Sequence, residues 1–109
     1  MSPLTITERN TAAGPVLEVF GDLDYAHAAA LRRRAESLPL RPGERLVVDL
    51  ANLEFCDSTG ITALLAARQH ALAAGADIAL ASVPANTLRI LTIVGLDRVF
   101  ALRPDTTDA

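Results

Sequence analysis

A short polar run, Asp57-Ser58-Thr59-Gly60, stands between an apolar segment and a pattern typical of an amphipathic helix. The Ser58 hydroxyl could serve as a chemical switch, but serine, threonine and aspartate are also the residue types preferred at helix N-caps. An oxygen of Asp57 or Ser58 would accept hydrogen bonds from free first-turn amides, and Gly60 would let the backbone pass close to its neighbours. Taken alone, the run favours a helix cap over a chemical role for Ser58.

The residues and motifs that enzymes most often use are sparse. The sequence contains neither the dinucleotide-binding pattern G-x-G-x-x-G nor a P-loop, and Ser58 does not lie in a G-x-S-x-G elbow. The two histidines, His27 and His70, are expected on helices as solvent-exposed side chains, and two histidines make a weak metal site. The ten basic residues are all arginine, so no lysine amine is available for Schiff-base chemistry. We therefore predict a protein without enzyme activity, metal or cofactor.

Charge and composition indicate which classes of partner and which cell compartment to expect. A net charge of −3 at pH 7 argues against a nucleic-acid binder that needs many phosphate contacts. No apolar run approaches the roughly 18 residues that span a bilayer, and segment 1–10 lacks the features of a signal peptide, so we predict a cytoplasmic protein without membrane insertion. Cys56, the single cysteine, is expected to be a small buried hydrophobe, and Arg32-Arg33-Arg34 a solvated helix face.

Hydrophobic periodicity predicts how the polar run is positioned. Asp24 is expected to cap the first helix through its carboxylate, and Pro39, Gly75 and Gly95 are expected to end the three helices. The predicted strands are 4–8, 16–20, 45–50, 78–83 and 99–102, and the predicted helical faces are 28–38, 61–74 and 84–94.

These elements predict one α/β domain over residues 1–109, with a core at about 4–102 and a flexible tail at 103–109. The expected order is β-β-α-β-α-β-α-β. The first two strands would form a hairpin, and the later strands would be joined by helical crossovers, so a mixed β-sheet with packed helices is expected.

Several motifs occur in a characteristic order along the chain. Gly21-Asp22-Leu23-Asp24 precedes the first helix, Val47-Val48-Asp49-Leu50 forms the central strand, and Asp57-Ser58-Thr59-Gly60 opens the second helix. Val94-Gly95-Leu96-Asp97-Arg98-Val99-Phe100 follows near the end. Together these motifs resemble the STAS domain of the bacterial anti-sigma factor antagonist family, over about residues 4–102.

The resemblance implies a binding switch. In that family the unmodified antagonist binds an anti-sigma factor that is also a serine kinase, and this binding releases a sigma factor. The kinase phosphorylates the serine of the D-S-x-G motif, which weakens the complex, and a serine phosphatase resets the cycle. By this match Ser58 is the expected phosphoacceptor, and Asp57, Ser58, Thr59 and Gly60 with Asp24 are expected to bind the partner.

Two departures from the family pattern and two rival functions remain at this stage. Thr59 stands where the family often has a second serine, so it could compete as phosphoacceptor, and Cys56 stands where a larger aliphatic residue is common. The first rival is a STAS subunit of a lipid-transport ABC system, a structural partner of its ATPase that needs no phosphorylation. The second is a small nucleotide-binding enzyme. The intact Asp-Ser-Thr-Gly run favours the phosphorylation switch over both.

Overall fold

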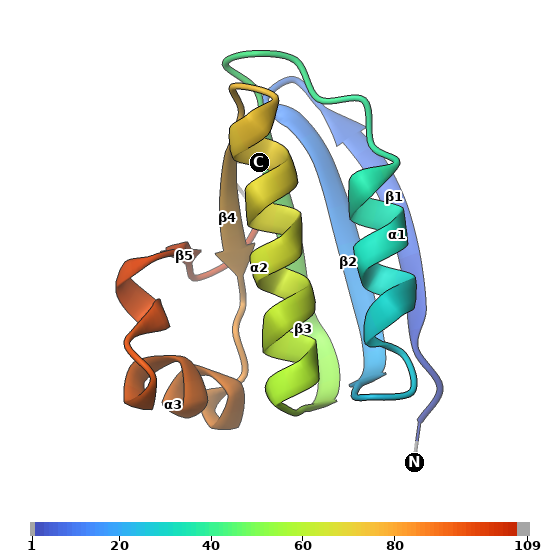
Figure 1. Cartoon of the computed structure of the whole chain (residues 1–109), viewed down its shortest axis with the longest axis vertical. Helices are drawn as coiled ribbons and strands as arrows, with labels where there is room; N and C mark the ends of the chain where they lie inside the picture. Colours follow the sequence, from blue (N-terminus) through green and yellow to red (C-terminus); the bar gives the residue numbers. More distant parts are fainter. Residues whose placement is uncertain (1, 107–109) are drawn as a thin grey trace.

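The computed structural model describes residues 2–106, and its five strands form one sheet in the order β1-β2-β3-β4-β5 (Figure 1). The predicted order of strands and helices is confirmed, with one added 3-10 turn, η1. The elements are β1 Thr5–Thr11, β2 Gly14–Leu23, α1 Ala28–Glu36, β3 Arg45–Cys56, α2 Ser58–Ala73, β4 Asp77–Ala81, α3 Ala85–Ile93, η1 Leu96–Arg98 and β5 Ala101–Arg103.

The sheet is mixed, as expected from the hairpin and the crossovers. β1 pairs antiparallel with β2, whereas β2–β3, β3–β4 and β4–β5 are parallel pairs. Parallel pairing brings the carboxyl ends of β2 and β3 to the same end of the sheet, where the chain turns into α1 and α2. This is the lower end of the molecule in Figure 1. The polar run and the Asp24 loop, 33 positions apart at Asp24 and Asp57, are thereby brought together.

Helices α1 and α2 lie side by side on one face of the sheet, and α3 lies beside the β4–β5 edge (Figure 1). The core under α1 and α2 is aliphatic, because alternate strand residues and one stripe of each helix point into it. Its fully buried side chains include Leu17, Leu31, Leu50, Leu64 and Leu80.

A second, smaller apolar cluster lies on the opposite sheet face and contains Val16, Val47, Ala79 and Ala81. The chain after β5 is tied to the body here, because Arg9 Nη2 donates to Thr106 Oγ1 over 3.2 Å. This hydrogen bond links the segment after β5 to β1. Residues 107–109 of the expected tail lie outside the described residues.

Several element boundaries differ from the sequence-based expectation. β3 continues to Cys56 and α2 begins at Ser58 instead of Ile61, because the cap at Asp57 starts the helix one turn earlier. The last strand begins at Ala101 instead of Val99, because Val99 is the C-cap residue of η1. Of the helices in residues 2–106, none is long and apolar enough to cross a membrane.

His70 is less exposed than the sequence suggested. It lies in α2, is half-buried, and its Nε2 is 3.0 Å from the backbone oxygen of Leu38 after α1. The neighbouring helix covers the ring because α1 and α2 pack against each other. His70 therefore links two elements of the scaffold.

Candidate functional site

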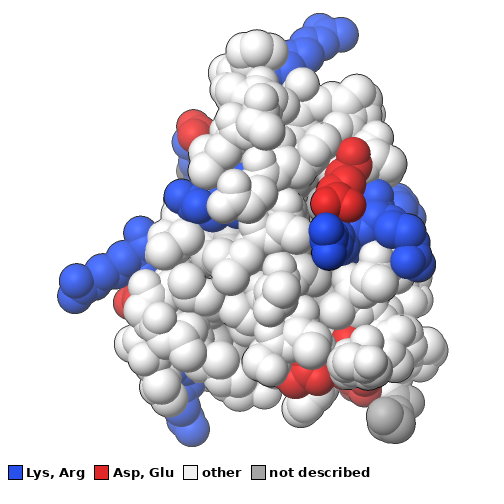
Figure 2. Space-filling model, viewed as in Figure 1, with Lys and Arg blue, Asp and Glu red and all other residues white. Residues whose placement is uncertain are grey.

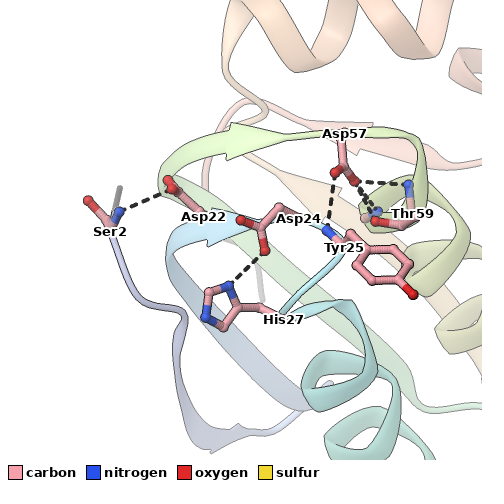
Figure 3. Close-up of polar contacts among 8 residues, drawn as sticks. Ser2, Asp22, Asp24, Tyr25, His27, Asp57 and Thr59 are labelled. Carbon is pink, nitrogen blue, oxygen red and sulfur yellow. Dashed lines mark hydrogen bonds and ion pairs between the residues drawn. The ribbon is translucent and has the colours of Figure 1, made fainter.

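The candidate site is the end of the sheet where β3 passes through Asp57 into α2 (Figure 3). Asp57 is the N-cap residue of α2, with extended backbone angles of φ −105° and ψ −172°. Its Oδ1 accepts hydrogen bonds from the Thr59 amide at 2.9 Å and the Gly60 amide at 3.1 Å. Asp57, and not Ser58, thus satisfies the free first-turn amides.

Asp57 also connects the two loops of the site. Its second oxygen, Oδ2, accepts a hydrogen bond from the Tyr25 amide at 3.1 Å, across 32 positions of sequence (Figure 3). The Thr59 hydroxyl donates to Oδ1 over 2.5 Å. This hydroxyl hydrogen bond is the main cause that lowers the pKa of Asp57, with the amides of Gly60, Tyr25 and Thr59 acting in the same direction against partial burial.

Ser58 is the first residue of α2 and is exposed. Its hydroxyl makes no hydrogen bond to any residue between positions 2 and 106, although its backbone oxygen accepts from the Thr62 hydroxyl at 3.1 Å. Thr59, in contrast, is half-buried and its hydroxyl is engaged by Asp57. Within Asp57–Gly60, Ser58 is therefore the residue whose hydroxyl is accessible for modification.

Gly60 is buried, and its position accepts no larger residue without movement. A Cβ there would lie 2.4 Å from the Leu23 oxygen and 2.8 Å from Cys56 Sγ. The absent side chain lets the first turn of α2 lie directly against the end of β2. Gly60 thus contributes to the site by shaping it from below.

The expectation that Asp24 caps the first helix is wrong. α1 begins at Ala28, its N-cap residue is His27, and no side chain caps it. The chain instead makes a turn in which the backbone oxygen of Asp24 accepts from the amides of His27 and Ala28. The Asp24 carboxylate is buried and accepts from His27 Nδ1 at 2.7 Å, so it fixes the His27 ring instead of the helix amides (Figure 3).

The candidate site contains an acidic cavity of about 420 Å³. Another cavity, of about 490 Å³, lies away from the site between α1 and β1. The lining of the acidic cavity includes Asp22, Asp24, Glu54 and Phe55. Figure 2 shows acidic side chains at the lower end of the molecule, right of centre, and a further acidic group higher on the right beside basic side chains. The cavity at the candidate site is therefore acidic and lies at the same end of the sheet as Ser58, although Ser58 is not among its lining residues.

Sequence reasoning missed three contributors to this site. Asp22 is buried and its Oδ2 accepts from the Ser2 amide at 3.0 Å, which holds the N-terminal segment against β2. Tyr25 and Phe55 are 84% and 48% exposed, so two of the four aromatic residues lie on the surface at this end. The sequence did contain a signal for the two aromatic residues. The chain has only four aromatic residues, yet Tyr25 directly follows Asp24 and Phe55 lies two positions before Asp57.

Cys56 is buried, as the sequence predicted, and its thiol is held in the protonated form. Burial is the main cause that raises the Cys56 pKa to about 12, and the neighbouring Asp57 charge adds to it. Within residues 2–106 no group of three or more histidine, cysteine, aspartate or glutamate side chains is arranged to hold a metal ion. The distinctive chemical feature of this end is thus the serine hydroxyl.

The Asp57 cap makes a testable contribution to stability. We expect Asp57→Ala to lower the free energy of unfolding by about 0.5–2 kcal/mol at pH 7, because the first-turn amides lose their acceptor. The folded-state pKa of Asp57 lies below its usual 3.8, so this contribution is present above that value and is lost as pH falls through the folded-state pKa. Urea unfolding in steps downward from pH 7 should show the difference from wild type shrinking in acid. The exposed residue Glu54 gives the control Glu54→Ala, and a deficit that stays constant with pH would contradict this role.

The mixed sheet, together with a second helix that is capped by Asp57 and begins at Ser58, is the architecture of a STAS domain. Residues 6–104 match the family model described as "Mlab, STAS domain", so the chain belongs to this family. A STAS-domain containing protein from Pseudomonas aeruginosa is 31% identical over 101 residues, covering 91% of this chain and 99% of that protein. The anti-sigma-F factor antagonist RsfB of Mycobacterium tuberculosis is 29% identical over 106 residues, covering 97% of this chain and 84% of RsfB.

The same fold is found in a solved structure of a named regulator. An anti-sigma factor antagonist from Mycobacterium paratuberculosis has a TM-score of 0.80 to this chain and 26% sequence identity. The alignment covers 97% of this chain and 90% of that structure. The relatives of this STAS domain therefore include proteins named as anti-sigma factor antagonists.

Proposed function

We propose that this protein is a cytoplasmic anti-sigma factor antagonist and that Ser58 is its phosphorylated residue. The unmodified protein binds an anti-sigma factor that is also a serine kinase, and a sigma factor is released. Phosphorylation of Ser58 weakens the complex, and a serine phosphatase restores binding. The observation that carries this proposal is the exposed, unbonded Ser58 hydroxyl beside a cap supplied entirely by Asp57.

The different hydrogen bonding of the two hydroxyl groups in Asp57–Gly60 supports Ser58 over Thr59 as the phosphoacceptor. A kinase needs a hydroxyl that can be brought in line with the transferred phosphoryl group, and the Ser58 hydroxyl breaks no internal hydrogen bond to do so. Transfer to Thr59 would cost its hydrogen bond to Asp57 Oδ1. The relatives named as anti-sigma factor antagonists support the same function for this chain.

The position of Ser58 also explains how phosphorylation would act without refolding the domain. A phosphoryl group adds about −1.5 to −2 charge, and at a helix N-terminus it faces the positive end of the helix dipole. The acidic residues Asp22, Asp24 and Glu54 already line the neighbouring cavity. The added charge would therefore make the surface more strongly acidic and bulkier, and the loss would fall on partner binding and not on folding.

The surface around Ser58 fits a partner with both apolar and basic groups. Tyr25 and Phe55 are exposed aromatic side chains, a residue type enriched at the centres of protein interfaces. Asp57 and Thr59, which are partly exposed, would form the polar part of the same surface. The buried Asp24 and Gly60 would support this surface from below. This arrangement supports the proposal of a binding protein whose affinity is set by one modification.

The proposal is tested with purified baits in lysate of the native host. Wild type and Ser58→Ala should retain a kinase-like anti-sigma factor, whereas Ser58→Asp should bind it about tenfold or more weakly, equivalent to about 1.4 kcal/mol. Gln69→Glu adds the same charge at an exposed position of α2 and serves as the matched control. Captured proteins are identified by mass spectrometry, and affinities are then measured with the purified partner.

Two results would contradict the proposal. One is equal capture of a transporter ATPase by all four baits, which would leave Ser58 without a switching role and favour the lipid-transport reading. The other is phosphorylation by the captured kinase that persists in Ser58→Ala and maps to Thr59 by peptide mass spectrometry.

A further inference from the structure

A second cavity, of about 300 Å³, lies beside α2 near the start of β4. It is lined by Arg45 from the start of β3, Arg68 from α2 and Asp77 from the start of β4, with Leu72 and Val99 as apolar walls. Arg68 follows Ser58 by ten positions along α2, which corresponds to about 15 Å of helix. The cavity is thus separate from the surface around Ser58.

Arg45 carries an unsatisfied polar atom in this region. Its Nε is buried and has no hydrogen-bond partner among residues 2–106. A buried guanidinium donor without an acceptor is costly, and buried polar groups in folded proteins are almost always paired. Arg9, Arg32 and Arg34 each pair with a carboxylate, whereas the Arg45 side chain does not. Arg45 therefore carries a positive charge that pairs with no carboxylate of the described residues.

The charges around the cavity indicate which kind of ligand it would bind. Arg68 is half-buried and likewise forms no ion pair or side-chain hydrogen bond in the described part of the chain. Asp77 is the register neighbour of Arg45 across β3 and β4, yet no ion pair joins them. Two guanidinium groups and one carboxylate leave an excess of one positive charge at the cavity. This balance favours an anion.

We propose that this cavity binds a small organic oxyanion, a carboxylate or a phosphate ester, between Arg45 and Arg68. The planar guanidinium groups match the oxygens of either headgroup in shape and charge. The apolar body of the ligand lies against Leu72 and Val99. The volume of the cavity is at the lower end of the range for small-molecule sites, which restricts the ligand to a small one.

Two probes test the site, benzoate for the carboxylate headgroup and phenyl phosphate for the phosphate ester. Each is titrated into the whole protein at constant ionic strength, and binding is followed by amide chemical shifts in NMR spectra. We expect saturable shifts at residues around Leu72 and Val99 with at least one probe. Arg68→Gln should weaken that binding at least tenfold, while Arg89→Gln, at an exposed α3 position with no described side-chain bond, should leave it unchanged.

The folded state of the variants is checked in the same spectra, and thermal unfolding provides a second readout. A saturating probe should raise the unfolding midpoint of wild type and Arg89→Gln more than that of Arg68→Gln, because stabilisation grows with the affinity of the folded state for the ligand. Shifts that never saturate, or equal affinity in Arg68→Gln and wild type for both probes, would overturn the proposal. None of these readouts uses the Ser58 partner, so the result is independent of the proposed function.

Discussion

Gly60→Ala is expected to destabilise the protein by about 1–3 kcal/mol, although alanine is the better helix former by about 1 kcal/mol. Sterics decide the sign, because the new Cβ would lie 2.4 Å from the Leu23 backbone oxygen and 2.8 Å from Cys56 Sγ. Backbone cannot move aside as a flexible side-chain end can. The first turn of α2 must therefore shift away from β2.

The same shift should disturb the candidate site. Asp57 bonds to the Tyr25 amide at 3.1 Å across the contact that Gly60 allows, so displacement of α2 should lengthen this link. Urea unfolding gives the loss in stability, and amide shifts of Tyr25 and Ser58 report the displacement. Gln69→Ala, at an exposed position of the same helix, should stay within about 0.5 kcal/mol of wild type. A Gly60→Ala protein as stable as wild type would show that the contact is looser than the structure indicates.

Leu64→Ala should produce the larger loss, about 2–5 kcal/mol. Leu64 is fully buried on the face of α2 that packs on the sheet, and its truncation removes apolar contacts and leaves a cavity. A domain of this size has a total stability of about 5–15 kcal/mol, so the variant would lose a large share of it. The measured quantity is the free energy of unfolding in urea, with an unchanged m value.

Leu72→Ala is the matched control for that experiment. The same side chain is removed from the same helix, but Leu72 is 44% exposed. The expected cost is within about 1 kcal/mol, because little buried surface and no enclosed cavity are created. Equal losses for Leu64→Ala and Leu72→Ala would mean that helix propensity, and not burial, governs the stability of α2.

Capping and the proposed modification involve different residues of one short run. A serine that caps its helix would have its hydroxyl occupied, and phosphorylation would remove a structural hydrogen bond. Here Asp57 carries the cap and the link to Tyr25, and Thr59 reinforces Asp57. The Ser58 hydroxyl therefore makes no hydrogen bond within the described residues. A phosphoryl group could be added to it and removed again without breaking a bond of the fold.

The sequence by itself determined the element order, the mixed sheet and the burial of Cys56, because these follow from local periodicity and from rules of strand connection. It also placed Asp57–Gly60 correctly at the start of a helix. The spacing of apolar residues is a local property of the sequence, so it predicts helices and strands without any information on contacts between distant residues.

Only the tertiary structure decided which oxygen caps α2 and what Asp24 does. Asp57 and Ser58 both belong to residue types that are preferred at helix N-caps. Asp57 takes this role because its backbone is extended at the end of β3. The parallel pairing of β2 and β3 also brings the Tyr25 amide beside its carboxylate. Asp24 has a helix after it in sequence, yet its carboxylate bonds to His27 because the chain turns before α1 begins. Such partners depend on strand register and on contacts between distant residues, so no local pattern specifies them.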